Sequence, residues 1–453
     1  MNEPNNPNSP APSTRRDFLK KTSTAVAGGA LLGSLSVERG AHAAGSDTLR
    51  IALIGCGGRG SGAADQALNA GGNGVKLIAM ADAFKDRLDG SFNELKKKHQ
   101  DKVEISDDHK FVGFDAYKSA IALADVVVLA TPPGFRPIHF EEAVRQGKHI
   151  FMEKPVATDA PGVRRVLAAA EEAKKKNLKV GVGLQRHHQL GYIETMNRLH
   201  DGEIGDITAM RCYWNGTTPW VHPRAELEKH ASRKLTEMEY QMRNWYYFVW
   251  LCGDHIVEQH IHNLDVINWV KQGHPVRAQG MGGVEVRKGP DYGEIFDHHA
   301  VEFEYADRSR CFSYCRHING CWSDVSEHVV GTKGSCHVGG GIGEHTMRDV
   351  KGEITWKFKG KGKDPYQQEH DDLFEAIRNN KPYNEAEYGA HSTMTAIFGR
   401  MATYSGKMIE WEDAINSKIS VMPRHFAWDA EPPVKPRPDG WYDHAVPGKT
   451  MVI

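Results

Sequence analysis

The chain has 453 residues, of which 40% are hydrophobic and 25% are charged, a balance typical of a globular protein with two to three domains. Lysine plus arginine (57) against aspartate plus glutamate (58) gives a net charge of −1. This balance argues against nucleic acid as a main partner, because neutralising phosphates needs a basic surface. The seven cysteines form no C-x-x-C pair, so we expect mostly buried thiols.

Residues 1–43 are predicted to be an export signal rather than part of the fold. Arg15-Arg16 precede a weakly apolar run at 25–37, and Ala41-His42-Ala43 is an A-x-A cleavage pattern. This order is typical of the twin-arginine route, so we expect a periplasmic or other extracytoplasmic location and a mature chain that begins near Ala44. The apolar run is shorter than the roughly 20 residues that cross a bilayer, so no stable membrane insertion is expected.

Strand-like and helix-like segments alternate from residue 49 to residue 184. Short apolar runs predict strands, and the amphipathic or charged stretches between them predict helices. This rhythm is typical of a doubly wound parallel sheet, so we predict an α/β fold with an N-terminal Rossmann domain over residues 44–186. The expected strands are 49–54, 75–81, 125–130, 149–152 and 179–184, and the expected helices are 61–69, 87–99 and 139–147.

The pattern changes after Arg186, where strand-like segments become longer and more polar. Such segments suit a large, mostly antiparallel open sheet with one face covered, so we predict a C-terminal α/β domain over residues 187–415. A helix at 384–406 is expected to pack on one of the sheets. The tail, 416–453, is predicted to be an extended arm on its own domain or on a neighbouring subunit. The expected strands are 207–214, 299–305, 310–315 and 335–338.

A glycine loop follows the first expected strand and opens an expected helix. In a G-x-G-x-x-G loop the first glycine permits a tight turn, the second lets the backbone approach a pyrophosphate, and the third allows helix–strand packing. The phosphate then lies at free N–H groups of the helix start. Asp82, at the end of the second strand, is expected to bind the adenosine ribose and to favour NAD, although Lys85 and Arg87 keep NADP open. These cofactor-binding candidates are Gly55, Gly57, Gly58, Arg59, Gly60 and Asp82.

Four motifs follow the glycine loop in order: Ala130-Thr131-Pro132-Pro133, His139, Gly147-Lys148-His149 and Glu153-Lys154-Pro155. This order resembles the Gfo/Idh/MocA oxidoreductase family, over about residues 48–415. The resemblance implies a Rossmann domain and an α/β domain whose open sheet carries substrate contacts and often oligomerises. It also implies that Lys154 reaches the nicotinamide region and the reacting hydroxyl, where an ammonium stabilises negative charge on oxygen. The motifs add Thr131, Pro132, Pro133, His139, Glu153 and Lys154 to the cofactor-binding candidates.

Residues 258–265, Glu-Gln-His-Ile-His-Asn-Leu-Asp, are similar to the D-x-G-x-H-x-x-D pattern of that family. The similarity implies His262 as the proton acceptor and Glu258 as its polar partner. Their spacing predicts that Glu258, His262 and Asp265 share one helical face, where a carboxylate can orient an imidazole. The departures from the pattern, Glu258 for Asp and His260 for Gly, leave open which group takes the proton. Lys154, His262 and Glu258 are therefore the catalytic candidates, and His260 and Asp265 are substrate-binding candidates.

Arg186 and Trp245 complete the substrate-binding candidates. Arg186 lies at the crossover where the family places substrate-facing residues, and a structural ion pair is the alternative. Trp245 belongs to the aromatic run 244–250, whose rings suit either the C–H faces of a sugar or core packing. The histidines at 255, 260 and 262 lack a zinc-binding pattern, so no metal is expected.

The combined pattern favours an NAD(P)-dependent oxidoreductase acting on a CH–OH group of a sugar, glycoside or polyol. Because NAD is scarce outside the cytoplasm, an exported enzyme is expected to retain its cofactor tightly. One alternative is an NAD-dependent glycosidase or lyase that oxidises its substrate transiently, with no net redox change; passing hydride between two sugars is a variant. A further alternative is a non-enzymatic sugar-binding protein that holds the nucleotide. The expected partners are a small carbohydrate and further copies of the chain, as a dimer or tetramer.

Overall fold

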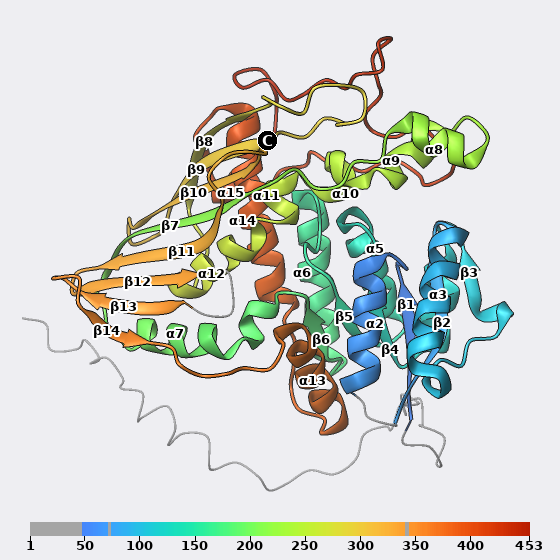
Figure 1. Cartoon of the computed structure of the whole chain (residues 1–453), viewed down its shortest axis with the longest axis horizontal. Coiled ribbons are helices and arrows are strands. Elements are labelled where there is room, and N and C mark those ends of the chain that lie inside the picture. The colour runs from blue at the N-terminus through green and yellow to red at the C-terminus, as the bar shows by residue number, and fades with distance from the viewer. Residues whose placement is uncertain (1–47, 71–73, 340–343) are drawn as a thin grey trace, which may run out of the picture. The chain divides into compact units, whose positions relative to one another are not determined.

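The computed structural model describes residues 48–70, 74–339 and 344–453, and residues 48–453 belong to one compact unit (Figure 1). The predicted export signal lies outside the described residues. None of the helices in the described ranges is long and apolar enough to cross a membrane. The predicted boundaries at 186 and 415 stay predictions, because the structure does not separate these parts into independent units.

The N-terminal half is built on a six-stranded, all-parallel sheet in the order β3-β2-β1-β4-β5-β6. The order reverses beside β1, and this switch point opens a crevice at the carboxyl ends of the strands. The predicted Rossmann topology is confirmed, with one short strand, β3, that the sequence did not reveal. The strands are β1 (Leu49–Ile54), β2 (Val75–Asp82), β3 (Lys110–Val112), β4 (Val126–Leu129), β5 (His149–Met152) and β6 (Val180–Val182).

Helices cover both faces of this sheet, and each face has its own apolar core. On one face α2 and α3 pack with α13, which returns from the C-terminal half to contribute Leu373 and Phe374. On the other face α4, α5 and α6 bury residues such as Ile121 and Phe140. The helices are α2 (Gly58–Ala70), α3 (Lys85–His99), α4 (Ala116–Leu123), α5 (Arg136–Arg145), α6 (Ala160–Lys175) and α13 (Pro365–Arg378).

The C-terminal half contains a nine-stranded sheet in the order β14-β13-β12-β11-β7-β10-β9-β8-β15. Every pairing in it is antiparallel except that between β7 and β10, so the predicted mostly antiparallel sheet is confirmed. The strands are β7 (Ile207–Gly216), β8 (Arg277–Gly283), β9 (His298–Glu304), β10 (Arg310–His317), β11 (Asp324–Gly331), β12 (Gly334–Gly339), β13 (His345–Asp349), β14 (Ile354–Lys357) and β15 (Ile409–Glu410).

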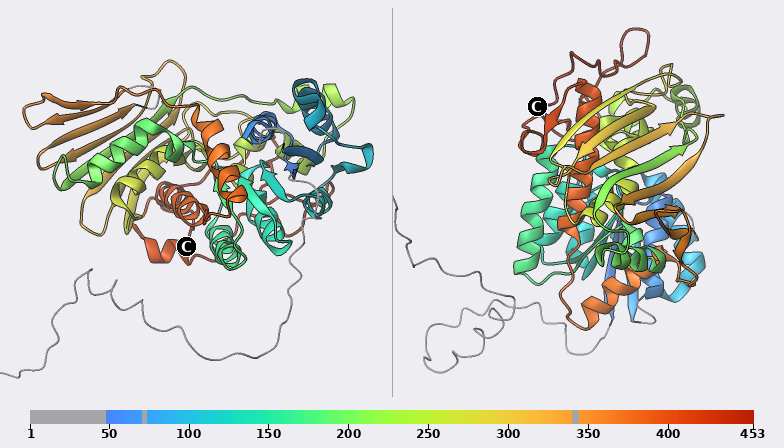
Figure 2. Two further views of the ribbon diagram at one scale, coloured as in Figure 1. Left: turned by 90° about the horizontal axis from the view of Figure 1, so that it is seen from below. Right: turned by 90° about the vertical axis from the view of Figure 1, so that its left-hand side faces the viewer.

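In the part of the chain that the structure describes, helices cover one face of the nine-stranded sheet and leave the other uncovered (Figure 2). Burial alternates along β10, where Cys311, Ser313 and Cys315 face the covered side while Phe312 and Tyr314 stay partly exposed. The long α14, predicted at 384–406, packs against both this sheet and α6 of the parallel sheet, and so joins the two halves. These helices are α7 (Leu190–His200), α8 (Arg224–Ala231), α9 (Glu237–Arg243), α10 (Val249–Cys252), α11 (His255–Glu258), α12 (Ile261–Lys271), α14 (Ala386–Ser405) and α15 (Trp411–Ile415).

The tail after α15 has no helix or strand and packs against its own chain. Its Trp428 ring lies 5.0 Å from that of Phe84 and 4.5 Å from that of Phe114, both near the carboxyl edge of the parallel sheet. The Asp159 carboxylate accepts a hydrogen bond from the backbone N–H of Val421. All seven cysteines lie in the described ranges as free thiols, and only Cys321 among them is exposed.

Candidate active site

A cavity of about 900 Å³ opens at the carboxyl edge of the parallel sheet and extends to α11, α12 and β7 of the C-terminal half. Its walls contain every cofactor-binding candidate and all three catalytic candidates, and of the substrate-binding candidates they contain Arg186 and Trp245. The structure therefore brings together residues from 55 to 262 that are far apart in the sequence.

The glycine loop has the geometry that a dinucleotide requires. Gly55 has φ +96°, and a Cβ there would lie 2.4 Å from the backbone N of Thr131. A Cβ on Gly60 would lie 1.9 Å from the carbonyl oxygen of Gly55, so only glycine lets the helix start approach the strand. A Cβ on Gly57 would meet nothing within 4 Å, because Gly57 borders the open cavity. This open space, at the N-terminal end of α2, fits a pyrophosphate.

Gly57→Ala and Gly60→Ala are expected to separate cofactor binding from folding. Gly60→Ala places a methyl group against backbone and should lower the free energy of unfolding by about 1–3 kcal/mol without any cofactor. Gly57→Ala should leave the unfolding of the cofactor-free protein unchanged and weaken NAD binding. Thermal melts and calorimetric titration with NAD measure both quantities, and wild-type NAD affinity in Gly57→Ala would contradict this placement of the pyrophosphate.

Asp82 holds the glycine loop and faces the cavity. Its Oδ2 accepts a hydrogen bond of 2.6 Å from the backbone N of Cys56, and its Oδ1 accepts one of 2.8 Å from that of Phe84. Burial raises the pKa of this carboxyl, and the two N–H donors oppose that effect. Each oxygen keeps a further lone pair, so the carboxylate can still accept from a ribose hydroxyl. Arg87, which the sequence offered as a partner for the 2′-phosphate of NADP, also lines the cavity.

The two motif segments 131–133 and 153–154 are held together by Arg136, a residue that the sequence analysis missed. Its guanidinium is fully buried and donates to the carbonyl oxygens of Thr131 (2.6 Å) and Glu153 (2.9 Å). An arginine between the Pro-Pro pair and His139, in an otherwise mostly apolar stretch, was the available signal. His139 lies 3.2 Å from the Thr131 hydroxyl, and burial lowers its pKa to about 3, so its imidazole is neutral. The segment that follows β4 thus forms part of the cavity wall, through Thr131, Pro132, Pro133 and His139.

Arg59 and Glu153, both cofactor-binding candidates, form an ion pair with a separation of 2.5 Å between Nε and Oε1. The pair joins the start of α2 to the segment after β5, on the cavity wall. It therefore fixes the distance between the glycine loop and Lys154.

Lys154 and Glu258 meet across the two halves of the molecule. The Lys154 ammonium donates to the Glu258 backbone carbonyl (2.7 Å) and lies 3.2 Å from Glu258 Oε1. Both side chains are mostly buried, and the other carboxylate oxygen, Oε2, has no partner in the described part of the chain. The pair therefore holds a cation and an anion at the inner end of the cavity.

His262 lines the cavity from the first turn of α12, and its ring stacks on that of Trp214 at 5.8 Å. Burial, together with the charges of Lys154 and Arg186, holds the pKa of His262 well below its ordinary value. The imidazole is therefore neutral near pH 7 and can accept a proton.

The prediction of one continuous helical face through Glu258, His262 and Asp265 is wrong. The helix is interrupted at Gln259 and His260, so Glu258 ends α11 and His262 is the second residue of the next helix, α12. The Glu258 carboxylate faces Lys154, and no hydrogen bond joins it to His262 in the described structure. Both side chains still reach the cavity, because each lies beside the break.

Two substrate-binding candidates, His260 and Asp265, do not line the cavity. His260 is fully buried, and its Nε2 lies 2.7 Å from the Ser313 hydroxyl of β10. Asp265 is buried under α14, where Ser392 donates to Oδ1 (2.8 Å) and Oδ2 lies 2.9 Å from His187 Nε2. The break after Glu258 turns both residues into the interior, so we assign them to packing and interior polar contacts.

Arg186 and Trp245 border the cavity in different ways. The Arg186 guanidinium forms an ion pair with the buried Glu327 and donates to the backbone carbonyl of His262 (3.2 Å). Arg186 therefore forms the structural ion pair that the sequence left as the alternative to a substrate contact. Its hydrogen bond to the His262 carbonyl also holds that catalytic candidate in position. Trp245 lies at the cavity with Trp220, whose ring is 5.7 Å away, whereas the next residues of the aromatic run are core. Trp214 and Trp220 also line the cavity.

A Rossmann sheet with this glycine loop, and a lysine and a neutral histidine at the far end of one cavity, defines the protein as an NAD-dependent oxidoreductase. Residues 49–183 match the family model described as the GFO_IDH_MocA oxidoreductase family, NAD-binding Rossmann fold. The match supports the resemblance found in the motifs, and NAD is the cofactor of this domain.

Known proteins similar to the chain include enzymes of carbohydrate and polyol chemistry. The scyllo-inositol 2-dehydrogenase (NAD(+)) of Bacillus subtilis is 25% identical over 327 residues, which cover 68% of this chain and 80% of that protein. A glycosyl hydrolase family 109 protein of Solibacter usitatus is 28% identical over 204 residues, covering 43% and 44%. The crystal structure of an aldose–aldose oxidoreductase from Caulobacter crescentus, complexed with glycerol, has a TM-score of 0.62 at 18% identity, covering 80% of this chain and 99% of that one. This last likeness shows the fold.

Proposed function

We propose that the protein oxidises a CH–OH group of a sugar, glycoside or polyol, using NAD that it retains between turnovers. The observation that carries the proposal is the Lys154–Glu258 pair beside the neutral His262 at the inner end of the NAD cavity. The similarity to an inositol dehydrogenase supports a polyhydroxylated substrate.

Three residues have distinct roles in the proposed oxidation. NAD supplies the acceptor for the hydride when it is bound. His262, neutral and lining the cavity, takes the hydroxyl proton at one of its ring nitrogens. The Lys154 ammonium hydrogen-bonds the substrate oxygen and stabilises the negative charge that develops on it. Glu258 keeps that ammonium in place through its carbonyl and its carboxylate.

Aromatic side chains on the cavity wall suit contact with the ring of the proposed substrate. Trp214, Trp220 and Trp245 all border the cavity on the side of the C-terminal half. The C–H faces of a sugar ring are apolar and pack against flat aromatic rings, while the hydroxyl groups remain free to hydrogen-bond. This arrangement supports a cyclic polyol or a pyranose rather than a linear acid.

Contacts over the adenosine end of the cavity support tight retention of NAD. Phe84 and Phe114 line the cavity, and Trp428 of the tail packs on both rings. The Arg243 guanidinium lies 4.0 Å above the Phe84 ring and forms an ion pair with Asp86 at 3.1 Å. We expect these contacts to slow release of the nucleotide. Retention also suits the proposed export by the twin-arginine route and a periplasmic or extracytoplasmic location, where free NAD is scarce.

A redox-neutral glycosidase is the second candidate, and the similarity to a glycosyl hydrolase family 109 protein favours it. Its mechanism would use the same His262 and Lys154 for a transient oxidation. The two candidates differ in whether reduced cofactor remains after turnover.

Incubation of the NAD-loaded protein with inositols, aldoses and glycosides separates these possibilities. We expect a keto product together with absorbance at 340 nm, and NAD that stays with the protein through gel filtration. Glycoside cleavage without that absorbance would favour the glycosidase. If no compound is altered, the enzyme proposal fails and the non-enzymatic alternative replaces it.

We also propose that the protein is a homo-oligomer. The uncovered face of the nine-stranded sheet exposes Phe312, Tyr314, Val330 and Met281, an apolar group on one surface. Exposed apolar patches of this kind mark interaction surfaces. Light scattering after gel filtration is expected to give a dimer or tetramer, and a monomer at micromolar concentration would contradict the proposal.

A further inference from the structure

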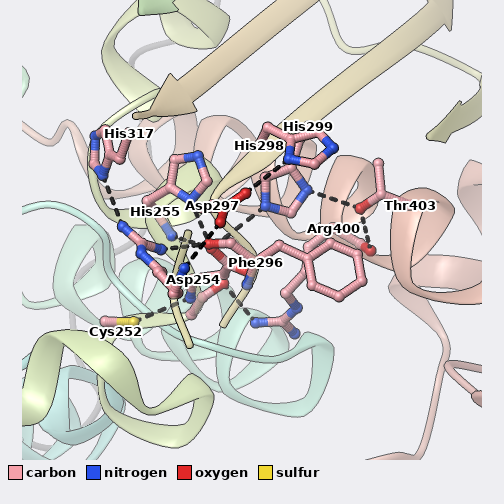
Figure 3. Close-up of polar contacts among 12 residues, drawn as sticks. Cys252, Asp254, His255, Phe296, Asp297, His298, His299, His317, Arg400 and Thr403 are labelled. Atoms are coloured by element: carbon pink, nitrogen blue, oxygen red, sulfur yellow. Dashed lines mark hydrogen bonds and ion pairs between the residues drawn. The ribbon is translucent and has the colours of Figure 1, made fainter. Parts of the chain in front are cut away.

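A second cluster of polar side chains lies behind the active site, away from the cavity. Asp254 and His255 are at the start of α11, and His299 is in β9 (Figure 3). All three are fully buried, and none of them lines the cavity. One possible metal-ligand atom from each lies within 4.8 Å of the other two.

The hydrogen bonds of His299 determine which of its ring nitrogens carries a proton. Nδ1 lies 2.9 Å from the Thr403 hydroxyl oxygen, and that hydroxyl donates its own proton to main-chain carbonyls of α14, Arg400 O at 3.0 Å and Gly399 O at 3.2 Å. Thr403 therefore accepts from Nδ1–H, and in a neutral imidazole the lone pair is then on Nε2.

The His299 Nε2 lone pair points at a carboxylate. Nε2 lies 3.3 Å from Asp254 Oδ1 and has no hydrogen-bond partner in the described ranges. Two electron-rich atoms at this distance, in a fully buried place, repel each other unless a proton on Nε2 or a metal cation lies between them. His255 approaches the same oxygen, with Nδ1 at 2.9 Å, and its Nε2 is likewise buried without a partner.

We propose that Asp254, His255 and His299 bind one divalent transition-metal ion, with Zn²⁺ as the ion that best suits two imidazoles and a carboxylate. Zinc bonds of 2.0–2.1 Å place neighbouring ligands of a tetrahedron roughly 3.3 Å apart. The separations of 2.9 and 3.3 Å around Asp254 Oδ1 are close to that value. Water completes the coordination, since the described chain offers three ligands here.

Neighbouring groups hold the proposed ligands in place. Asp254 Oδ2 accepts from the Tyr404 hydroxyl (2.5 Å) and the Phe296 backbone N (3.0 Å). Oδ1 accepts from the His255 backbone N (2.5 Å) and keeps a further lone pair for the ion. The Thr403 contact on His299 is the kind of outer hydrogen bond that orients a metal-binding histidine. Nearby His317 is not a ligand through Nδ1, because that atom accepts a hydrogen bond from Arg287.

The ion would connect three elements that support the active site. Asp254 caps α11 and His255 is its first residue, and its last residue is Glu258, the partner of Lys154. His299 belongs to β9, and Tyr404 and Thr403 belong to α14. Since the cluster is enclosed and does not reach the cavity, the ion is structural rather than a reactant. No metal is expected from the sequence, because the histidines at 255, 260 and 262 lack a zinc-binding pattern. The proposed site instead combines His255 with His299 of β9.

Metal content of the full-length protein tests the proposal. Protein stripped with a chelator, reconstituted with ZnCl₂ and desalted is expected to hold one tightly bound zinc per chain by plasma mass spectrometry, and to unfold at a higher temperature than the stripped protein. Reconstitution with CoCl₂ should give visible absorption bands of a four-coordinate nitrogen–oxygen site. His299→Gln should lose the bound metal, the cobalt bands and the thermal shift together.

His298→Gln is the matched control, because His298 is the adjacent residue on the opposite side of β9, where it pairs with Asp297 and is partly exposed. It should retain the metal. If the wild-type protein binds neither zinc nor cobalt, or if His299→Gln keeps both, the proposal is overturned and a proton on His299 replaces the ion. Should His299→Gln fail to fold, the wild-type stoichiometry and the thermal shift still decide.

Discussion

Lys154→Met is expected to lower kcat by a factor of about 10²–10³, because it removes the cation that stabilises charge on the substrate oxygen. Methionine keeps most of the volume, so NAD binding should change little. The substitution also leaves the Glu258 carboxylate without its ion partner in a mostly buried place. We therefore expect a small loss of thermal stability beside the large loss of turnover.

Two further variants serve as controls for Lys154→Met. Lys175→Ala, on the exposed side of α6, removes an equal charge far from the cavity and should behave as wild type. Lys154→Arg should not restore turnover, since a planar guanidinium does not replace a compact ammonium. Full turnover in Lys154→Met, measured at saturating substrate, would show that another group stabilises the oxygen.

His262→Asn is expected to lower kcat/KM by about 10²–10⁴, the usual contribution of a positioned general base. The pH dependence of the wild type adds a sharper test. Because the pKa of His262 lies well below its ordinary value, the histidine stays neutral as the pH falls through 6.5. The acid limb of the kcat/KM profile should therefore lie below pH 6.5, and a limb at or above that pH would contradict the assignment.

The same depressed pKa has a consequence for stability. In the unfolded chain His262 takes up a proton near its ordinary pKa, whereas in the folded protein it does not. The unfolded state thus binds more protons below about pH 6.5, so this residue lowers the free energy of unfolding as the pH falls through that range. His262→Asn should reduce that part of the pH dependence, which denaturant titrations at pH 5 and pH 7 can measure.

Local sequence patterns were enough to predict the Rossmann half. The segments 49–54 and 125–130 form strands that are mostly buried, because all their side chains except those of Arg50 and Asp125 are apolar. Gly55 and Gly60 are required by backbone contacts that other residues cannot make. Lys154 was predictable because its motif directly follows a strand.

The arrangement around His262 was less predictable, because it depends on contacts between distant segments. Residues 258–262 contain no proline or glycine that would indicate a helix break, so the spacing favoured one continuous helix. Arg136 donates to two backbone carbonyl groups. Because every residue has such a carbonyl, the sequence does not indicate which ones a buried arginine will contact. His299 meets Asp254 only through the fold of the nine-stranded sheet.

We propose that this cavity oxidises a sugar or polyol carbon with its own NAD. The most direct measurement is a single turnover of NAD-loaded protein with a substrate deuterated on its carbon atoms, quenched with acid-free denaturant, followed by mass spectrometry of the nicotinamide nucleotide. We predict reduced cofactor one mass unit heavier than the unlabelled form, in the wild type and not in Lys154→Met or His262→Asn. Conversion of the substrate with no deuterium in the nucleotide would contradict the account.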